Sequence, residues 1–175
     1  KGWLFRGGDV IEKAASLNQI VFDKTGTLTI GRPLVIGCLR AKNQNHMLQL
    51  AASLEENSRH PLAHAILQEA QKQELKLLNS FNTKTIPGKG LAGELDGIEG
   101  TIRVGTPEWL KSEGVKFGFD WAQTSINGET IVAVSKAEEL LGLILIDDQI
   151  RPNVDLALKR LRDNGLQLSM LSGDR

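Results

Sequence analysis

The chain lacks the patterns that mark several large classes of protein. Its 175 residues include a single cysteine, Cys38, which excludes an internal disulfide framework and any Cys-x-x-Cys metal site. No apolar run approaches the roughly 20 residues that a membrane-spanning helix needs, and no secretory signal peptide is recognisable. Lys plus Arg and Asp plus Glu both total 21, so the formal net charge is zero. We therefore expect a soluble region of a reducing compartment with no nucleic-acid partner.

The two ends of the chain share the pattern of a parallel α/β domain. Apolar residues predict one buried strand over Ile20–Phe22 and another over Leu166–Leu171. A helix is expected over Val154–Asp163, because Arg151-Pro152 precedes it and Asn164-Gly165 can end it. The order of strand, helix and strand implies a parallel sheet.

The long stretch between these ends follows a different pattern. Helical spacing occurs over residues 45–55 and 61–75, with Pro61 in a first helical turn, and short β-like runs separated by turn residues follow Leu78. The expected strands of this stretch are Phe81–Ile86, Leu91–Leu95, Gly100–Val104 and Thr130–Ser135, interrupted by a short helix at Pro107–Ser112. Leu140–Ile146 is expected to form a further strand. We predict an α+β domain over residues 34–141, inserted between residues 1–33 and 142–175.

A seven-residue motif follows the first expected strand. Residues 23–29 read Asp-Lys-Thr-Gly-Thr-Leu-Thr, which places a carboxylate at the carboxyl edge of a parallel sheet, where open α/β folds bind their ligands. The motif closely resembles the phosphorylation motif of the P-type ATPases. That resemblance implies that Asp23 is the nucleophile that accepts the γ-phosphate of ATP.

Phosphoryl transfer to a carboxylate brings two negative groups together, so the site needs Mg²⁺ and positive or N–H donors. Lys24 supplies a positive charge, and Thr25 and Thr27 offer hydroxyl and N–H groups to the phosphoryl oxygens. We expect Asp23 and Thr25 to hold the Mg²⁺ ion.

The same nucleophilic Asp occurs in the haloacid-dehalogenase-like phosphatases, whose pattern resembles Asp-x-Asp. Their second Asp acts as acid and base, whereas Thr25 occupies that position here and cannot do so. A persistent phosphoenzyme is therefore expected. A soluble phosphatase of this type and a non-catalytic nucleotide-binding module are the alternatives.

A second group of residues resembles the adenosine pocket of heavy-metal (type IB) P-type ATPases. His60-Pro61 resembles the His-Pro dipeptide of that branch, and Glu55 stands five residues before the His, as in the family. The imidazole offers a flat ring and a hydrogen-bonding nitrogen, and the carboxylate can accept from the adenine amino group. A capping or merely exposed His60 is the alternative, and a zinc site with His64, four residues on, is not favoured.

Further glycine positions match the same family. Pro87-Gly88-Lys89-Gly90 corresponds to its Gly-x-Gly loop, which lets a nucleotide lie against backbone. Gly105 corresponds to a family Gly that is followed by Asn, but Thr106 stands here in place of the Asn. Thr106 keeps a hydroxyl and loses the amide.

The last part of the chain resembles the family's return into the phosphorylation domain. Asp148, four residues before Pro152, can brace the hinge, and Ser172-Gly173-Asp174 resembles the Thr-Gly-Asp motif with its hydroxyl retained. Ser172 is expected to bind a phosphoryl oxygen, and Asp174 to contact ATP or the hinge.

Taken together, the resemblance implies a partial haloacid-dehalogenase-like (Rossmann-like) phosphorylation domain with an inserted α+β nucleotide-binding domain. It implies ATP and Mg²⁺ as ligands, and as partners the actuator domain and membrane helices of a pump, through which the heavy-metal ion would pass. This region would face the cytosol or stroma, bind ATP and show little turnover by itself. Copper(I) is the preferred ion, with zinc or cadmium as the alternative.

Overall fold

The computed structural model describes residues 4, 6–124 and 128–171. These residues divide into two compact units, one from the ranges 1–31 and 150–175 and the other from the range 32–149. The expected insert, residues 34–141, is shorter than the second unit because strands β2 (Thr29–Leu39) and β7 (Glu139–Ile150) both run beyond it. The chain passes from one unit to the other within β2 and at the end of β7.

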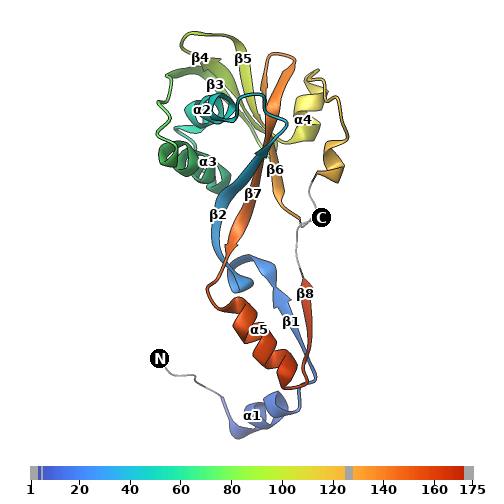
Figure 1. The fold of residues 1–175 in the computed structure, drawn as a ribbon. Helices are drawn as coiled ribbons and strands as arrows, with labels where there is room; N and C mark the ends of the chain where they lie inside the picture. Colours follow the sequence, from blue (N-terminus) through green and yellow to red (C-terminus); the bar gives the residue numbers. More distant parts are fainter. Residues whose placement is uncertain (1–3, 5, 125–127, 172–175) are drawn as a thin grey trace. The chain divides into compact units, whose positions relative to one another are not determined.

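The first unit contains a two-stranded parallel sheet. Strand β1 (Gln19–Asp23) pairs with β8 (Gln167–Leu171), from Gln19 opposite Gln167 to Asp23 opposite Leu171. Helix α5 (Val154–Asp163) precedes β8 and lies against it (Figure 1). The predicted strand, helix and strand, and their parallel arrangement, are therefore confirmed. Helix α1 (Gly8–Ala15), which the sequence analysis does not predict, precedes β1.

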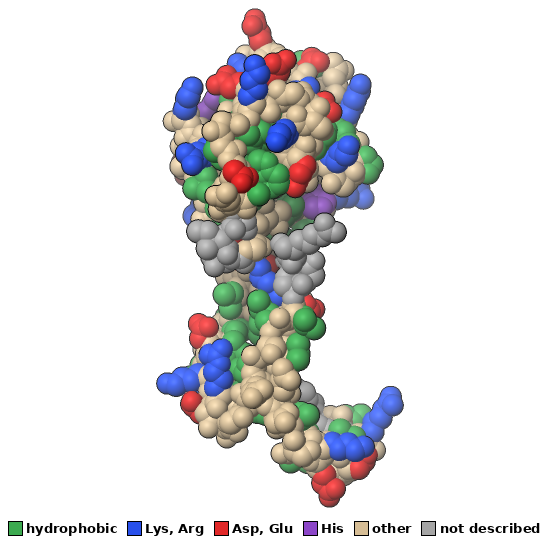
Figure 2. All heavy atoms as spheres, turned by 90° about the vertical axis from the view of Figure 1, so that its right-hand side faces the viewer, with side chains coloured by type: hydrophobic (Ala, Val, Ile, Leu, Met, Phe, Trp, Pro, Cys, Tyr) green, Lys and Arg blue, Asp and Glu red, His purple; other side chains and the backbone are tan. Residues whose placement is uncertain are grey.

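Apolar side chains lie at the surface of the first unit. No residue of α1, β1, α5 or β8 is buried, and several large apolar side chains in these elements are at least half exposed, as the green side chains in the lower part of Figure 2 show. They include Ile11, Val21, Leu156, Met170 and Leu171. The described elements of this unit therefore enclose no core of their own.

The second unit is built on a six-stranded sheet with the order β2-β7-β6-β5-β4-β3. Consecutive strands from β3 to β7 pair in antiparallel fashion, as the sequence predicts. The remaining strands are β3 (Ser80–Ile86), β4 (Gly90–Leu95), β5 (Ile98–Gly105) and β6 (Thr130–Lys136).

Helices cover both faces of this sheet. Helices α2 (Gln44–Glu55) and α3 (Pro61–Lys72) pack on one face, and α4 (Pro107–Ser112) packs on the other (Figure 1). Side chains that alternate along a strand point to opposite faces, so Val132 and Val134 join the core under α2 and α3, while Ala133 joins the core under α4. A 3-10 helix, η2, spans Trp121–Gln123. The predicted α+β insert with helices on an antiparallel sheet is confirmed.

Candidate functional site

Asp23 is the last residue of β1, at the carboxyl end of the strand, and it is exposed. The chain then makes a single turn, η1 (Lys24–Leu28), in which Thr25 (φ −77°, ψ 124°) and Gly26 (φ 77°, ψ −13°) leave the helical region. The positive φ at Gly26 is one that residues with a Cβ rarely adopt. The position of Gly in the motif therefore has a local structural reason.

The hydroxyl of Thr29, the last residue of the motif, braces this turn from within. Its Oγ1 accepts a hydrogen bond from Gly26 N at 3.0 Å and donates one to the carbonyl oxygen of Lys24 at 3.1 Å. Thr29 is buried, so water does not compete strongly for these bonds. Both ends of the turn are thus joined by one side chain.

Arg151 fastens the outer side of the same turn. Its Nη2 donates to the carbonyl oxygen of Gly26 at 2.8 Å, and its Nε donates to that of Thr27 at 3.0 Å. Its backbone N–H donates to the carbonyl oxygen of Leu28 at 2.9 Å. A planar guanidinium can bind two neighbouring carbonyls at once, which Lys cannot do in the same way. In the sequence, Arg151-Pro152 indicates only the start of a helix, and no local pattern reveals the contact of Arg151 with this turn.

The metal-binding prediction for this turn rests on two residues. Asp23 offers a carboxylate, and Thr25 offers a hydroxyl and a carbonyl, and Mg²⁺ binds oxygen ligands of these kinds. No group of three or more His, Cys, Asp or Glu side chains lies close together among the described residues. Ser172, Gly173 and Asp174, which we expect beside the phosphoryl group, lie outside the described part of the chain.

Asp148, the expected hinge residue, lies in the second unit near the end of β7. Its Oδ1 accepts a hydrogen bond from the backbone N–H of Arg32 at 2.7 Å. This bond joins β7 to β2, the two strands in which the chain passes between the units.

A cavity of about 260 Å³ in the second unit gathers the residues predicted to bind the nucleotide. Its floor includes the apolar side chains of Ile66, Leu91, Val104 and Val132. The predicted residues that line it are Glu55, His60, Gly88, Gly90, Gly105 and Thr106. They come from α2, the start of α3, the β3–β4 turn and the end of β5.

Glu55, the last residue of α2, is a buried carboxylate that lines this cavity. Its side chain is 7% exposed, and its Oε2 accepts no hydrogen bond from any residue that the structure describes. Desolvation raises the pKa of the Glu55 carboxyl above its usual value, and a hydrogen bond with the Ser58 side chain partly opposes that rise. A buried polar atom without a partner is costly, so Oε2 is suited to accept from a donor on a ligand.

His60 is exposed and precedes the first residue of α3. Its Nδ1 accepts a hydrogen bond from the backbone N–H of Leu62 at 3.2 Å, so His60 is the N-cap of the helix. The capping alternative is therefore correct, but it does not remove His60 from the cavity wall. With Nδ1 used as an acceptor, the neutral imidazole carries its proton on Nε2 and can donate it to a ligand. His64 is exposed on α3, as expected.

Two of the predicted glycines bring backbone segments into close contact. A Cβ on Gly90 would overlap the carbonyl oxygen of Val104, and a Cβ on Gly105 would overlap that of Lys89. Gly88 has a φ of 71°, and the space around its missing Cβ is open. Gly90 and Gly105 are therefore required for the pairing of β4 with β5, whereas Gly88 is required only by its backbone angle.

Thr106, which replaces the family Asn, has a structural role beside the cavity. Its Oγ1 accepts from the backbone N–H of Trp109 at 3.3 Å and caps α4. Asn, Asp, Ser and Thr all serve this purpose, so the replacement preserves the cap. Because the hydroxyl accepts in this bond, its own proton is available to a ligand.

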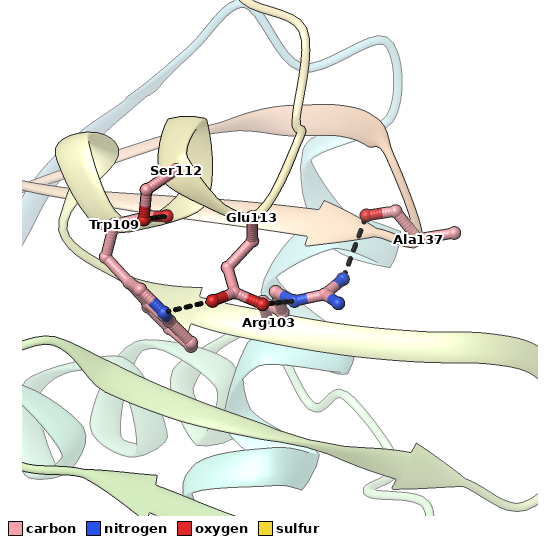
Figure 3. Close-up of polar contacts among 5 residues, drawn as sticks. All are labelled: Arg103, Trp109, Ser112, Glu113 and Ala137. Atoms are coloured by element: carbon pink, nitrogen blue, oxygen red, sulfur yellow. Dashed lines mark hydrogen bonds and ion pairs between the residues drawn. The ribbon is translucent and has the colours of Figure 1, made fainter.

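A polar network holds α4 and the Trp109 side chain in place (Figure 3). Trp109 Nε1 donates to Glu113 Oε1 at 3.2 Å, and Glu113 Oε2 lies 3.6 Å from Arg103 Nε. Arg103 Nη1 donates to the carbonyl oxygen of Ala137 at 3.1 Å. The buried Trp109 ring would contact any Cβ on Gly90 or Gly105, so this network fixes the part of the wall formed by those glycines.

Comparison with known proteins agrees with this arrangement. The profile of the haloacid dehalogenase-like hydrolase family matches residues 17–175. A chloroplastic copper-transporting ATPase of Arabidopsis thaliana is 34% identical over all of this chain and 22% of its own length. Copper-exporting P-type ATPase B of Archaeoglobus fulgidus is 36% identical over 99% of this chain and 25% of its own length.

A solved structure extends this similarity to the fold. The crystal structure of a zinc-transporting PIB-type ATPase matches 98% of this chain and 28% of that protein, with a TM-score of 0.79 and 30% identity. The chain thus spans about a quarter of the length of the relatives it matches. Among the described residues, no helix is both long and apolar enough to cross a membrane. The chain belongs to the haloacid dehalogenase-like hydrolase family, within which it corresponds to a segment of the heavy-metal P-type ATPases.

Proposed function

We propose that this chain is the ATP-binding and aspartyl-phosphorylation region of a heavy-metal-transporting P-type ATPase. The observation that carries the proposal is the cavity of the second unit, where Glu55, His60 and the three predicted glycines meet around an apolar floor. A nucleoside needs these features together, because its base is flat and apolar on its faces and hydrogen-bonds at its edge.

In this proposal the adenine base enters the cavity and its amino group donates to Glu55 Oε2. That carboxylate oxygen is buried and accepts no bond from the described residues, so binding would satisfy it. The His60 ring would stack on the base or donate through Nε2. Gly88, Gly90 and Gly105 line the wall, and the space beside the Gly88 Cα is open to a ligand.

The chemical step is proposed at Asp23. A carboxylate oxygen of Asp23 attacks the γ-phosphorus of ATP, the bond to the bridging oxygen breaks, and ADP leaves. Lys24 supplies positive charge, and Thr29 and Arg151 fix the turn that follows the nucleophile. Bound Mg²⁺, held by Asp23 and Thr25, would neutralise charge on the phosphates.

Copper(I) is the proposed transported ion, and zinc is the second candidate. The Arabidopsis and Archaeoglobus relatives are named as copper-transporting and copper-exporting proteins, while the structural relative is named as zinc-transporting. The ion would pass through membrane helices of the full pump. The region described here would then lie on the cytosolic or stromal side.

Two other functions stay open to experiment. A soluble phosphatase would require an acid and base two residues after the nucleophile, where Thr25 stands. A non-catalytic nucleotide-binding module would use the cavity and leave Asp23 dispensable.

The test is to incubate the purified chain with γ-³²P-labelled ATP and Mg²⁺ beside Asp23→Asn and Asp23→Ala. Label that is stable in acid, released by hydroxylamine and absent from both variants would support the proposal. ATP binding without label in any variant would favour the nucleotide-binding module. Hydrolysis of small phosphate esters that depends on Asp23 would favour the phosphatase.

A further inference from the structure

Lys89 lies in the wall of the nucleotide cavity and has no role in the proposed function. Among the described residues that line the cavity, the titratable side chains are Glu55, His60 and Lys89. Glu55 is buried and acidic, and His60 is exposed. Lys89 therefore supplies the permanent positive charge of a wall that is otherwise mostly apolar and hydroxyl-bearing.

The backbone of Lys89 is held in a defined position. Its N–H donates to the carbonyl oxygen of Ile86 at 3.0 Å, which closes the β3–β4 turn, and its carbonyl oxygen accepts from Thr106 N at 2.8 Å. Gly88 and Gly90 flank it with positive φ angles. The turn therefore keeps the Lys89 Cα at the cavity wall.

The Lys89 side chain itself is exposed and makes no ion pair with any residue that the structure describes. A lysine that merely stabilised the β3–β4 turn would be expected to pack or pair its charge there. An unpaired cation at the edge of an apolar cavity instead suits a ligand with an apolar part and an anionic part.

We propose that Lys89 binds the phosphates of the nucleotide, so that the cavity prefers ADP and ATP over adenosine. This inference rests on the proposed nucleotide-binding function. The base would occupy the apolar floor of the cavity. Glu55 is acidic and would disfavour phosphate groups there, so the phosphates would extend to the exposed ammonium group of Lys89. The positive charge of Lys89 would also offset the repulsion between the Glu55 carboxylate and the polyphosphate.

Lys84 provides a matched control on the same hairpin. It is an exposed lysine of β3, but it lines a different groove, together with Arg103 and Glu113. Removing either lysine changes the net charge of the chain by the same amount. Only removal of Lys89 takes a charge from the nucleotide cavity.

The experiment is calorimetric titration of the whole chain with adenosine, AMP, ADP and ATP, beside Lys89→Ala, Lys89→Arg and Lys84→Ala. The wild type should bind ADP and ATP more tightly than adenosine. Lys89→Ala should weaken ADP and ATP binding by roughly three- to tenfold, in the range of a partly exposed charged hydrogen bond, and leave adenosine binding unchanged. Lys89→Arg should retain the preference, and Lys84→Ala should behave as the wild type.

Four results would overturn the inference. Equal weakening of adenosine and ADP by Lys89→Ala would assign Lys89 to the base or to the fold, and an equal effect of Lys84→Ala would assign the preference to net charge. If the wild type binds adenosine and ADP equally well, nucleotide binding stands and the role of Lys89 fails. If the folded wild type binds no nucleotide, both the proposed function and the role of Lys89 fail. Thermal unfolding of each variant separates misfolding from lost contacts.

Discussion

At the scale of single residues, the buried carboxyl group of Glu55 lowers the stability of the folded chain, and a bound ligand would relieve this effect. Its carboxyl group is buried, its Oε2 has no partner among the described residues, and desolvation raises its pKa. Structures retain such groups mainly where function requires them. The sequence alone predicts Glu55 from its distance to His60, but its burial depends on how α2 packs on the sheet.

Replacement of Glu55 by Gln should stabilise the nucleotide-free chain at pH 7 by about 1 kcal/mol, because the neutral amide avoids the cost of burying an ionised carboxylate. Because the folded-state pKa is raised, the wild type is penalised as the pH rises from the ordinary value of 4.5 through the folded-state pKa. The advantage of Glu55→Gln should therefore vanish below that value. Thermal unfolding of the wild type and Glu55→Gln from pH 3.5 to 8 measures this difference in stability. A difference that grows in acid would contradict the account.

The same substitution should weaken ADP binding at pH 7, because a neutral amide oxygen is a poorer acceptor than a carboxylate. Glu56, the next residue, is exposed, so Glu56→Gln is the matched control and should alter neither property. Tighter ADP binding by Glu55→Gln would remove the carboxylate from the proposed site.

At the scale of elements, pattern and turn chemistry predicted much of the fold. Helix α4 lies where it is expected, and α2, α3, α5 and the strands β1, β3–β6 and β8 agree closely with the predicted ranges, whereas β7 runs four residues beyond its predicted end at Ile146. Strand β2 was not predicted, because Gly31, Pro33 and Gly37 interrupt its pattern. Proline is tolerated on edge strands, and β2 is at the edge of the sheet. That position is a tertiary property that a local pattern does not contain.

The pairing of β4 with β5 gives a prediction about the cavity glycines. Gly90→Ala should destabilise the chain by at least about 2–3 kcal/mol, because its Cβ would overlap backbone of β5 and the Trp109 ring. Gly88→Ala should cost only about 1–2 kcal/mol, the price of a positive φ in open space. Urea unfolding compares the two variants. Equal costs would mean that the strands do not approach as closely as described.

The turn after β1 gives a second prediction at this scale. Arg151→Ala should speed amide hydrogen exchange over residues 24–29, because it removes the side-chain bonds to the carbonyls of Gly26 and Thr27. Arg151→Lys should rescue this only partly, since an ammonium cannot replace the planar fork. Arg160, an exposed residue of α5, is the control, and Arg160→Ala should leave exchange in the turn unchanged. Unaltered exchange in Arg151→Ala would show that Thr29 suffices to hold the turn.

At the scale of the whole molecule, the two units differ in how far they can stand alone. Both core clusters and every residue that lines the candidate cavity lie within residues 32–149. In the other unit, α1, β1, α5 and β8 contain no buried residue. The sequence predicts an insert over residues 34–141 from the change of pattern after the first strand. It does not predict the contacts of Arg151 with the turn after β1, because they depend on side-chain geometry.

A shortened chain of residues 32–149 should therefore fold and bind ADP with an affinity within about threefold of that of the whole chain, a difference of less than 1 kcal/mol. Circular dichroism and calorimetric titration measure folding and affinity. A folded fragment that no longer binds ADP would mean that residues outside 32–149 complete the site.

The central claim is that the cavity lined by Glu55 and His60 binds the nucleotide. Its most direct test is calorimetric titration of ADP into the wild type, His60→Asn and His64→Asn. Asn is a good N-cap, so His60→Asn keeps the start of α3 and removes only the ring, while His64→Asn changes an exposed His four residues further along the helix. The account predicts saturable binding that His60→Asn weakens at least tenfold, or about 1.4 kcal/mol, with His64→Asn unchanged. Wild-type affinity in His60→Asn at unchanged thermal stability would contradict it.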